Sequence, residues 1–178
     1  MPGNPHEHLL DGEKKMSHPY DDIAAKLGEI YAALAKLGLD DVLAKGVGNL
    51  LLARELNHKL IPGDKGADAH EIEDVSQKFE YKVSISDQFN FNFGARKRED
   101  GATCETVVGN HFKDIAGTYC AARKDAEITR VVYCESAPLI ADLVDHFEKT
   151  SGGQLNKVYR IETFLSLKGA RDVKRATS

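Results

Sequence analysis

The chain has 178 residues, 42% of them hydrophobic, which is enough to form one globular core. Its formal net charge of −4 disfavours an indiscriminate nucleic-acid binder, because such proteins depend on clearly basic surfaces. No stretch approaches the roughly 20 apolar residues of a membrane-spanning helix. The polar N-terminus lacks the apolar core of a signal peptide, so we expect a cytoplasmic protein without a membrane partner.

The first half of the chain predicts two helices and three short strands. We expect residues 1–20 to form a flexible arm and residues 21–178 to form a single domain. Apolar residues at helical spacing predict helices over residues 21–37 and 41–60, ended by glycine or by a Pro-Gly pair. Alternating side chains then predict extended segments, which lie near residues 68–73, 78–86 and 89–93.

The second half continues the alternation of helix and strand. The apolar pattern predicts a helix over residues 106–121, a buried strand over 127–134, an amphipathic helix over 136–149 and a strand over 158–167. A mixture of this kind is typical of an α/β protein with a central sheet flanked by helices.

Two carboxylates and a lysine are expected to meet where two of these strands pair. Glu80 and Lys82 project from the same face of one strand, because strand side chains alternate with a period of two. Asp68 can return across a hairpin to face Glu80. Mg²⁺ prefers oxygen ligands, often one or two carboxylates completed by water and phosphate oxygens. A Glu-x-Lys pair on the wet face of a half-buried strand is also common without any function.

The spacing of these residues resembles that of the PD-(D/E)XK nuclease superfamily. Asp68, a gap of twelve residues and Glu80-Tyr81-Lys82 match its motif, and the small size resembles type II restriction endonucleases. The resemblance implies a restriction-endonuclease-like core, a mixed sheet flanked by helices, in which Asp68 and Glu80 bind one or two Mg²⁺ ions. It also implies that Lys82 assists the attacking water. The Pro-Asp pair of the family is absent here, so Asp64 in Pro62-Gly63-Asp64 is a rival metal ligand.

The resemblance also suggests a supporting glutamate in the preceding helix. Relatives often place such a residue near the second metal position, and Glu55 is the candidate here. The alternative is an exposed glutamate paired with Arg54 or with Lys59, which lies four residues further along a helix.

A row of amide side chains offers a candidate surface for DNA recognition. Alternation places three phenylalanines inward and the amides outward, and amides suit bidentate contacts to adenine edges in the major groove. A basic run follows that could neutralise phosphates or read guanine. The candidate DNA-binding residues are Gln88, Asn90, Asn92, Arg96, Lys97 and Arg98. The alternative is a polar outer face that keeps an edge strand from aggregating.

Together these features favour a Mg²⁺-dependent endodeoxyribonuclease that cuts duplex DNA at a short, palindromic sequence. Two-fold symmetric sites suit two-fold symmetric proteins, so a homodimer is expected, with the helices of residues 21–60 as the interface. The alternatives are a repair or junction-resolving nuclease of the same fold and a noncatalytic DNA-binding or assembly protein. No glycine-rich phosphate loop points to an organic cofactor.

Overall fold

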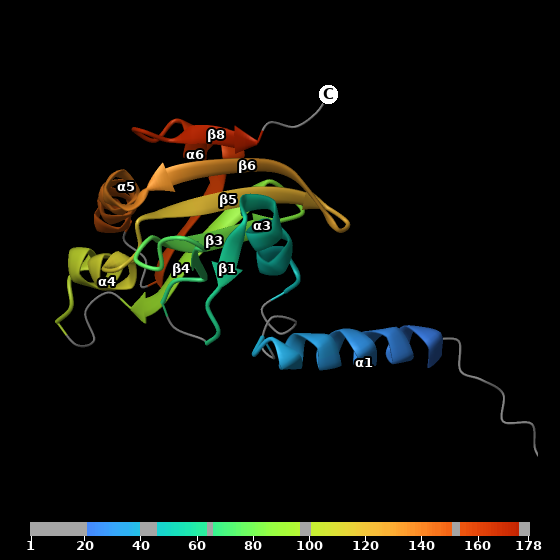
Figure 1. The fold of residues 1–178 in the computed structure, drawn as a ribbon. Coiled ribbons are helices and arrows are strands. Elements are labelled where there is room, and N and C mark those ends of the chain that lie inside the picture. The colour runs from blue at the N-terminus through green and yellow to red at the C-terminus, as the bar shows by residue number, and fades with distance from the viewer. Residues whose placement is uncertain (1–20, 40–45, 64–65, 97–100, 151–153, 175–178) are drawn as a thin grey trace, which may run out of the picture.

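The computed structural model describes residues 21–39, 46–63, 66–96, 101–150 and 154–174. Figure 1 draws the remaining residues as a thin grey trace. The arm expected over residues 1–20 therefore lies outside the described residues, as do Asp64, Lys97 and Arg98. Among the described segments, no helix is both long enough and apolar enough to cross a membrane.

A six-stranded mixed sheet forms the centre of the molecule, with the order β1-β2-β3-β5-β6-β8. β1, β2 and β3 are antiparallel neighbours, β3 runs parallel to β5, and β6 and β8 continue antiparallel. The strands are β1 (His58–Leu60), β2 (Ala69–Glu71), β3 (Lys78–Ser84), β5 (Gly117–Lys124), β6 (Glu127–Glu135) and β8 (Arg171–Lys174). The fold is thus of the α/β class, as the sequence predicts. Its main sheet is mixed, with a single parallel pair of described strands at its centre.

A second, two-stranded sheet is built from β4 (Gln88–Arg96) and β7 (Gln154–Arg160), which pair antiparallel. Phe89 and Phe91 of β4 are buried, and so are Leu155 and Tyr159 of β7. This sheet therefore has one apolar face, packed inward, and one outer face.

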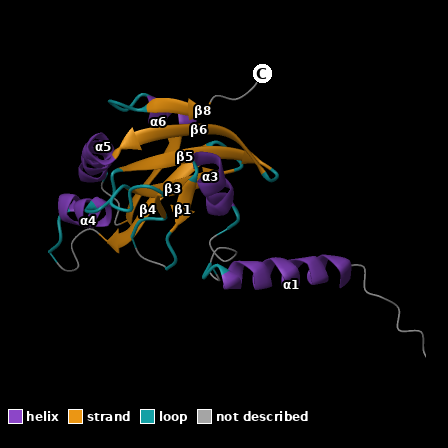
Figure 2. Cartoon of the chain, viewed as in Figure 1, coloured by secondary structure: helices purple, strands orange, loops and turns teal. Residues whose placement is uncertain are grey.

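Helices cover both faces of the main sheet, as Figure 2 shows in purple. α3 (Gly48–Leu56) lies over one face, where Leu51, Leu52 and Ala53 pack with Phe79 and Tyr81 of β3. The opposite face is covered by the β4–β7 sheet and three helices, which are α4 (Cys104–Phe112), α5 (Ser136–Lys149) and α6 (Ile161–Leu165). In Figure 1, α1 (Asp21–Lys36) extends away from this body.

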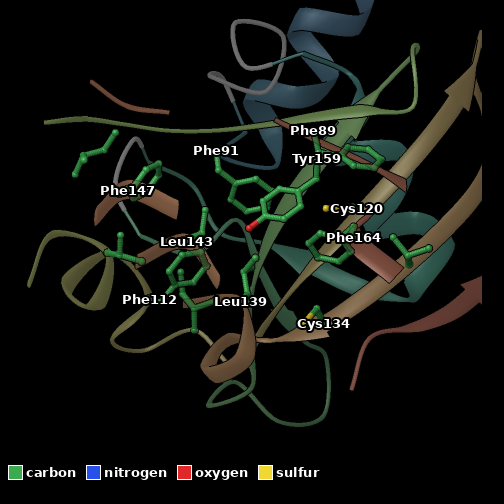
Figure 3. Close-up of a cluster of buried hydrophobic side chains, with 14 of the residues drawn as sticks. Phe89, Phe91, Phe112, Cys120, Cys134, Leu139, Leu143, Phe147, Tyr159 and Phe164 are labelled. Carbon is green, nitrogen blue, oxygen red and sulfur yellow. The ribbon is translucent and has the colours of Figure 1, made fainter. Parts of the chain in front are cut away.

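The larger core lies between the main sheet and this second layer. Figure 3 shows aromatic rings of β4, β7, α4, α5 and α6 gathered over the cysteines of β5 and β6. The ring centroids of Phe91 and Tyr159 are 5.3 Å apart at an edge-to-face angle of 82°. Cys120 and Cys134 are fully buried free thiols. The second layer is therefore bound to the sheet by close aromatic packing.

Several predicted elements are confirmed and others are wrong. The strands at 78–86 and 127–134 and the helix at 136–149 are present within a few residues. The helix predicted over 41–60 is wrong at its end, because α3 stops at Leu56 and Asn57 adopts a left-handed conformation with φ 55°. The next three residues form β1. The expected strand at 89–93 exists, but it belongs to the second sheet.

Two further errors lie in the second half. The helix predicted over 106–121 ends at Phe112, and residues 117–124 form β5. A strand buried on both faces has apolar residues in succession, and such a run also fits helical spacing. The strand predicted over 158–167 ends at Arg160, where the chain turns directly into α6.

Candidate functional site

Glu80 and Lys82 project from one face of β3, on the side covered by the β4–β7 sheet. Phe79 and Tyr81 point to the other face, into the core beneath α3. Glu80 is only 5% exposed, and the Lys82 ammonium lies 5.5 Å from the centre of the Phe91 ring in β4. Alternation predicts that the face of β3 with Glu80 and Lys82 is exposed to solvent. In the structure the β4–β7 sheet and its helices largely enclose this face.

Asp68 is anchored to β3 between these two residues. Its backbone N–H donates to the Phe79 carbonyl at 2.9 Å, and its Oδ2 accepts from the Tyr81 backbone N–H at 2.7 Å. Tyr81 stands between Glu80 and Lys82 in the sequence. The hairpin thus brings the Asp68 carboxylate to the point on β3 where the predicted pair begins.

The N-terminal turn of α3 holds the other oxygen of this carboxylate. The amide of Asn49 donates to Asp68 Oδ1 at 3.1 Å. α3 reaches the strand because Gly48 has no side chain: an added Cβ would lie 2.8 Å from Cβ of Val83. Asp68 therefore accepts hydrogen bonds from both the strand and the helix, one on each carboxylate oxygen.

Glu80 is a buried carboxylate with two basic neighbours. Lys82 Nζ donates to its Oε1 at 2.5 Å, and His111 Nε2 of α4 lies 3.6 Å from its Oε2. Burial raises the pKa of the Glu80 carboxyl, but the interactions with His111 and Lys82 outweigh burial and hold the pKa below its usual value. Glu80 is therefore ionised at neutral pH despite its burial.

Lys82 is charged for the same reason. Burial lowers the pKa of its ammonium, but the charge and hydrogen bond of Glu80 exceed this effect and raise the pKa, with a further contribution from the negative charge of Asp68. The charge of Asp68 thus acts on Lys82 in the same direction as that of Glu80, with a smaller effect. In this state Lys82 is a hydrogen-bond donor and a positive charge.

Thr118 provides an unused polar atom beside this cluster. It pairs with Glu80 in the β3–β5 register and lies on the same face as Cys120, its neighbour two residues on. Its hydroxyl oxygen is buried and has no hydrogen-bond partner within the described segments. A buried hydroxyl without a partner is costly, so this position suits an ordered water next to the carboxylate.

A cavity of about 250 Å³ opens beside the cluster. His111, which contacts Glu80, lines it, together with Ala67, the neighbour of Asp68. Lys78 and Lys113 contribute positive charge to its wall, with one carboxylate from Asp114. The cavity can therefore receive an anionic group next to the two carboxylates.

The residues present fit Mg²⁺ in type and number. Asp68 and Glu80 supply two carboxylates, and Mg²⁺ commonly takes one or two from the protein, with water and phosphate completing the octahedron. No set of three or more His, Cys, Asp or Glu side chains is arranged as a metal site within the described ranges. The ion would thus be held by these two carboxylates, with water beside Thr118 and oxygens of the substrate.

Other predicted site residues lie elsewhere or outside the described ranges. Glu55 forms an ion pair with Lys174 of β8 at 2.8 Å, so its side chain is held by the strand at the edge of the sheet. Its assistance to a second metal ion remains a prediction that this contact does not support. Asp64 lies outside the described residues, so the structure does not place the rival ligand.

The predicted amide row lies on the outer face of the β4–β7 sheet. Gln88, Asn90 and Asn92 are exposed and alternate with buried phenylalanines. Asn92 Oδ1 accepts the Gly94 backbone N–H at 2.9 Å. Arg96 is the last residue of β4, and its backbone pairs with Gln154.

Sequence reasoning did not place Asn49, His111 or Thr118 beside the predicted carboxylates. Asn49 is one polar residue in an apolar helix, and its contact with Asp68 spans 19 positions. His111 of α4 lies 31 positions after Glu80 in the sequence, and its contact with Glu80 arises from the packing of α4 against the sheet. Thr118 lay within the segment predicted to be helical, so its place beside Glu80 had no signal in the sequence.

No protein-family model matches the chain, and no curated protein matches it at a significant level.

Proposed function

We propose that this chain is a Mg²⁺-dependent endodeoxyribonuclease that hydrolyses phosphodiester bonds of duplex DNA at a short specific sequence. The observation that carries the proposal is the position of Asp68, whose carboxylate binds the Tyr81 backbone between the buried Glu80 and Lys82. Two fixed carboxylates with a lysine between a sheet and a basic cavity suit metal-assisted attack on a phosphate.

Each residue of the cluster has a defined role in this proposal. Asp68 and Glu80 hold the cation, which when bound makes water more acidic and neutralises charge on the phosphate. Lys82, held protonated by Glu80, donates a hydrogen bond and places positive charge where negative charge develops. Thr118 can accept or donate to a water beside Glu80, because its hydroxyl has no other partner within the described segments.

The cavity supplies the path of the phosphate backbone. Lys78 and Lys113 line it with His111, which also contacts Glu80. Lysines are common phosphate binders in proteins, and the carboxylate of Asp114 offsets part of their charge in the same wall. Phosphate contacts from these two lysines would act at the cavity although the chain as a whole has a formal net charge of −4.

The order of elements supports the same proposal. α3 is followed by the antiparallel strands β1, β2 and β3, then by α4 and by β5 parallel to β3. The PD-(D/E)XK resemblance implies the same order of helix, three strands, helix and strand, but the third strand that the sequence predicts for it, near residues 89–93, is β4 of the second sheet, and β1 takes its place in the count. β4 is an insertion between β3 and α4, and it pairs with β7 outside the main sheet.

Incubation of supercoiled plasmid with the protein and Mg²⁺ tests the proposal. Discrete fragments are expected, and EDTA should abolish them. Glu80→Ala and Lys82→Ala should each stop cleavage, while Lys149→Ala, which removes an exposed helical ion pair with Asp145, should leave it unchanged. Cutting only at junctions or damaged sites would indicate a repair nuclease of the same fold. Intact plasmid under all conditions, or unchanged cutting by either site variant, would contradict the assignment.

A homodimer is part of this proposal, with α1 as its interface. Ile23, Leu27 and Ile30 are exposed on α1. Together with Leu34 and Leu37 they form a series of apolar residues separated by four, three, four and three positions. That spacing is typical of a helix that packs against another helix. An antiparallel copy would also bring Asp22 near Lys36 of its partner, which favours pairing. Light scattering should give twice the chain mass, and Ile30→Asp should give a monomer; a monomeric wild type at tens of micromolar would contradict it.

A further inference from the structure

The outer face of the β4–β7 sheet has an unusual composition. Its three rungs pair Gln88 with Arg160, Asn90 with Val158 and Asn92 with Asn156. All six side chains are exposed, four of them are amides, and none is acidic. We call these six residues the ribbon face. The sequence predicts the amide row of β4, and the structure adds Asn156, Val158 and Arg160 of β7 beside it.

Solubility alone does not explain this composition. Surface strands are usually protected from aggregation by charged side chains, above all lysine. The ribbon face has one charged residue, Arg160, and leaves Val158 51% exposed at its centre. Amides that offer both donors and acceptors, one guanidinium and one apolar group are instead the groups that distinguish base pairs.

The dimensions of the ribbon match those of the major groove of DNA. A two-stranded antiparallel ribbon fits this groove, which is about 12 Å wide. Successive outward residues on a strand are about 6.7 Å apart, close to the rise of two base pairs at about 3.4 Å each. The three rungs therefore extend over about 13 Å, the length of roughly four base pairs.

The ribbon is also connected to the candidate site. Phe93, which follows Asn92, packs its ring 5.2 Å from that of His111, in a T-shaped contact. His111 in turn lies 3.6 Å from Glu80. The rung formed by Asn92 and Asn156 is thus at the end of the ribbon nearest the carboxylates. The inner face is rigid, since Tyr159 and Lys157 of β7 both bind Asp142 of α5.

We propose that the ribbon face enters the major groove of duplex DNA and reads its base sequence. The inference rests on the proposed nuclease function and names its specificity surface. Asn90 and the other amides contact adenine edges, Arg160 contacts guanine, and Val158 contacts a thymine methyl group. The ribbon face should not recognise duplex RNA, because the major groove of RNA is deep and too narrow for side chains to contact the bases.

Selection from a randomised DNA library tests this inference. Wild type, Asn90→Ala, Val158→Ala and Arg160→Ala are each incubated with the library in Ca²⁺, and the bound duplexes are sequenced. Gln77→Ala serves as the matched control, because Gln77 is an exposed amide in the turn between β2 and β3. Circular dichroism of each variant verifies folding, and the exposed positions make unfolding an implausible cause of any change.

The wild type should enrich one short sequence, and each ribbon variant should lose about tenfold to a hundredfold discrimination at one or two adjacent positions of it. Gln77→Ala should enrich the wild-type sequence. A sequence unchanged by all three ribbon variants would overturn the inference. Cleavage in Mg²⁺ is measured in parallel. If the ribbon variants leave the enriched sequence unchanged but the protein still cuts DNA, the nuclease function stands without this surface. If the wild type neither binds nor cuts DNA, both proposals fail. Relaxed specificity without any cutting supports the ribbon and contradicts the nuclease.

Discussion

Replacement of Lys82 by methionine should destabilise the fold, because it leaves the Glu80 carboxylate buried without its main partner. Removal of one member of a fully buried ion pair costs about 3–5 kcal/mol. Lys82 is 26% exposed here and His111 remains near Glu80, so water and the imidazole recover part of this loss. We expect the free energy of unfolding to fall by about 2 kcal/mol.

A double-mutant cycle separates this effect from the loss of side-chain packing. Glu80→Gln alone should cost about 1–2 kcal/mol, since it leaves the Lys82 ammonium with the more distant Asp68 charge. The double variant Glu80→Gln/Lys82→Met should cost less than the sum of the two single variants, by about 1–2 kcal/mol. The coupling is the contribution of the ion pair itself.

Urea unfolding at neutral pH, followed by circular dichroism, measures these free energies. Lys149→Met is the control: its ion pair with Asp145 is 2.7 Å long, but both side chains are more than half exposed. Such surface pairs contribute about 0–1 kcal/mol. The reasoning would be refuted if the free energy of unfolding of Lys82→Met were within 0.5 kcal/mol of the wild-type value. It would also be refuted if the effects of the two single variants added up to that of the double variant.

Three other predictions follow from particular contacts. Gly117→Ala should lower the free energy of unfolding by about 2 kcal/mol and the melting temperature by about 5 °C, because the new Cβ would lie 2.4 Å from the Tyr133 hydroxyl; an unchanged melting temperature would contradict this packing. Burial raises the pKa of Asp142, but Lys157 and Tyr159 outweigh it and lower the pKa. The stabilisation by Asp142 is therefore present above pH 4 and lost as the pH falls through the lowered pKa. Asp142→Asn should be less stable than the wild type by about 1–2 kcal/mol at pH 7, and the two should converge near pH 2; a constant difference between pH 7 and pH 2 would be inconsistent. Asn49→Ala removes a hydrogen-bond donor to Asp68, the proposed metal ligand, so Mg²⁺-dependent cleavage should slow by about 10- to 100-fold, and a rate equal to the wild type would exclude a supporting role.

Local periodicity predicted the parts of the fold that contain one clear pattern. Alternation over residues 78–85 placed Glu80 and Lys82 on one face of β3, and the amphipathic pattern of residues 136–149 gave α5. The amide row on β4 followed from the same alternation. These predictions succeed because apolar and polar side chains separate onto opposite faces of each element.

The remaining features depend on contacts between distant segments. β1 has only three residues, too few to show a period, and its place is set by pairing with β2. β5 is buried on both faces, so its apolar run could not be distinguished from a helix. The burial of Glu80 arises from β4, which leaves the main sheet and returns over it. The sequence of β3 alone therefore does not indicate that Glu80 is buried.

The residues of the candidate site also fall into a group that local sequence predicts and a group that tertiary contacts place. Asp68, Glu80 and Lys82 are close in sequence, and a hairpin register is sufficient to bring them together. Asn49, His111 and Thr118 come from α3, α4 and β5, and each reaches the site through tertiary packing alone. The sequence therefore predicts the carboxylates and the lysine, whereas the structure adds the polar groups that surround them.

Anomalous diffraction from crystals soaked in Mn²⁺, with and without bound DNA, tests the central claim most directly. Mn²⁺ takes the oxygen ligands that Mg²⁺ takes and identifies its own position by its anomalous signal. We predict a peak between the carboxylates of Asp68 and Glu80, with the Lys82 ammonium displaced from Glu80 toward the cavity lined by Lys78 and Lys113. Absence of a peak at these carboxylates in both crystals, or a peak only at another site, would contradict the account.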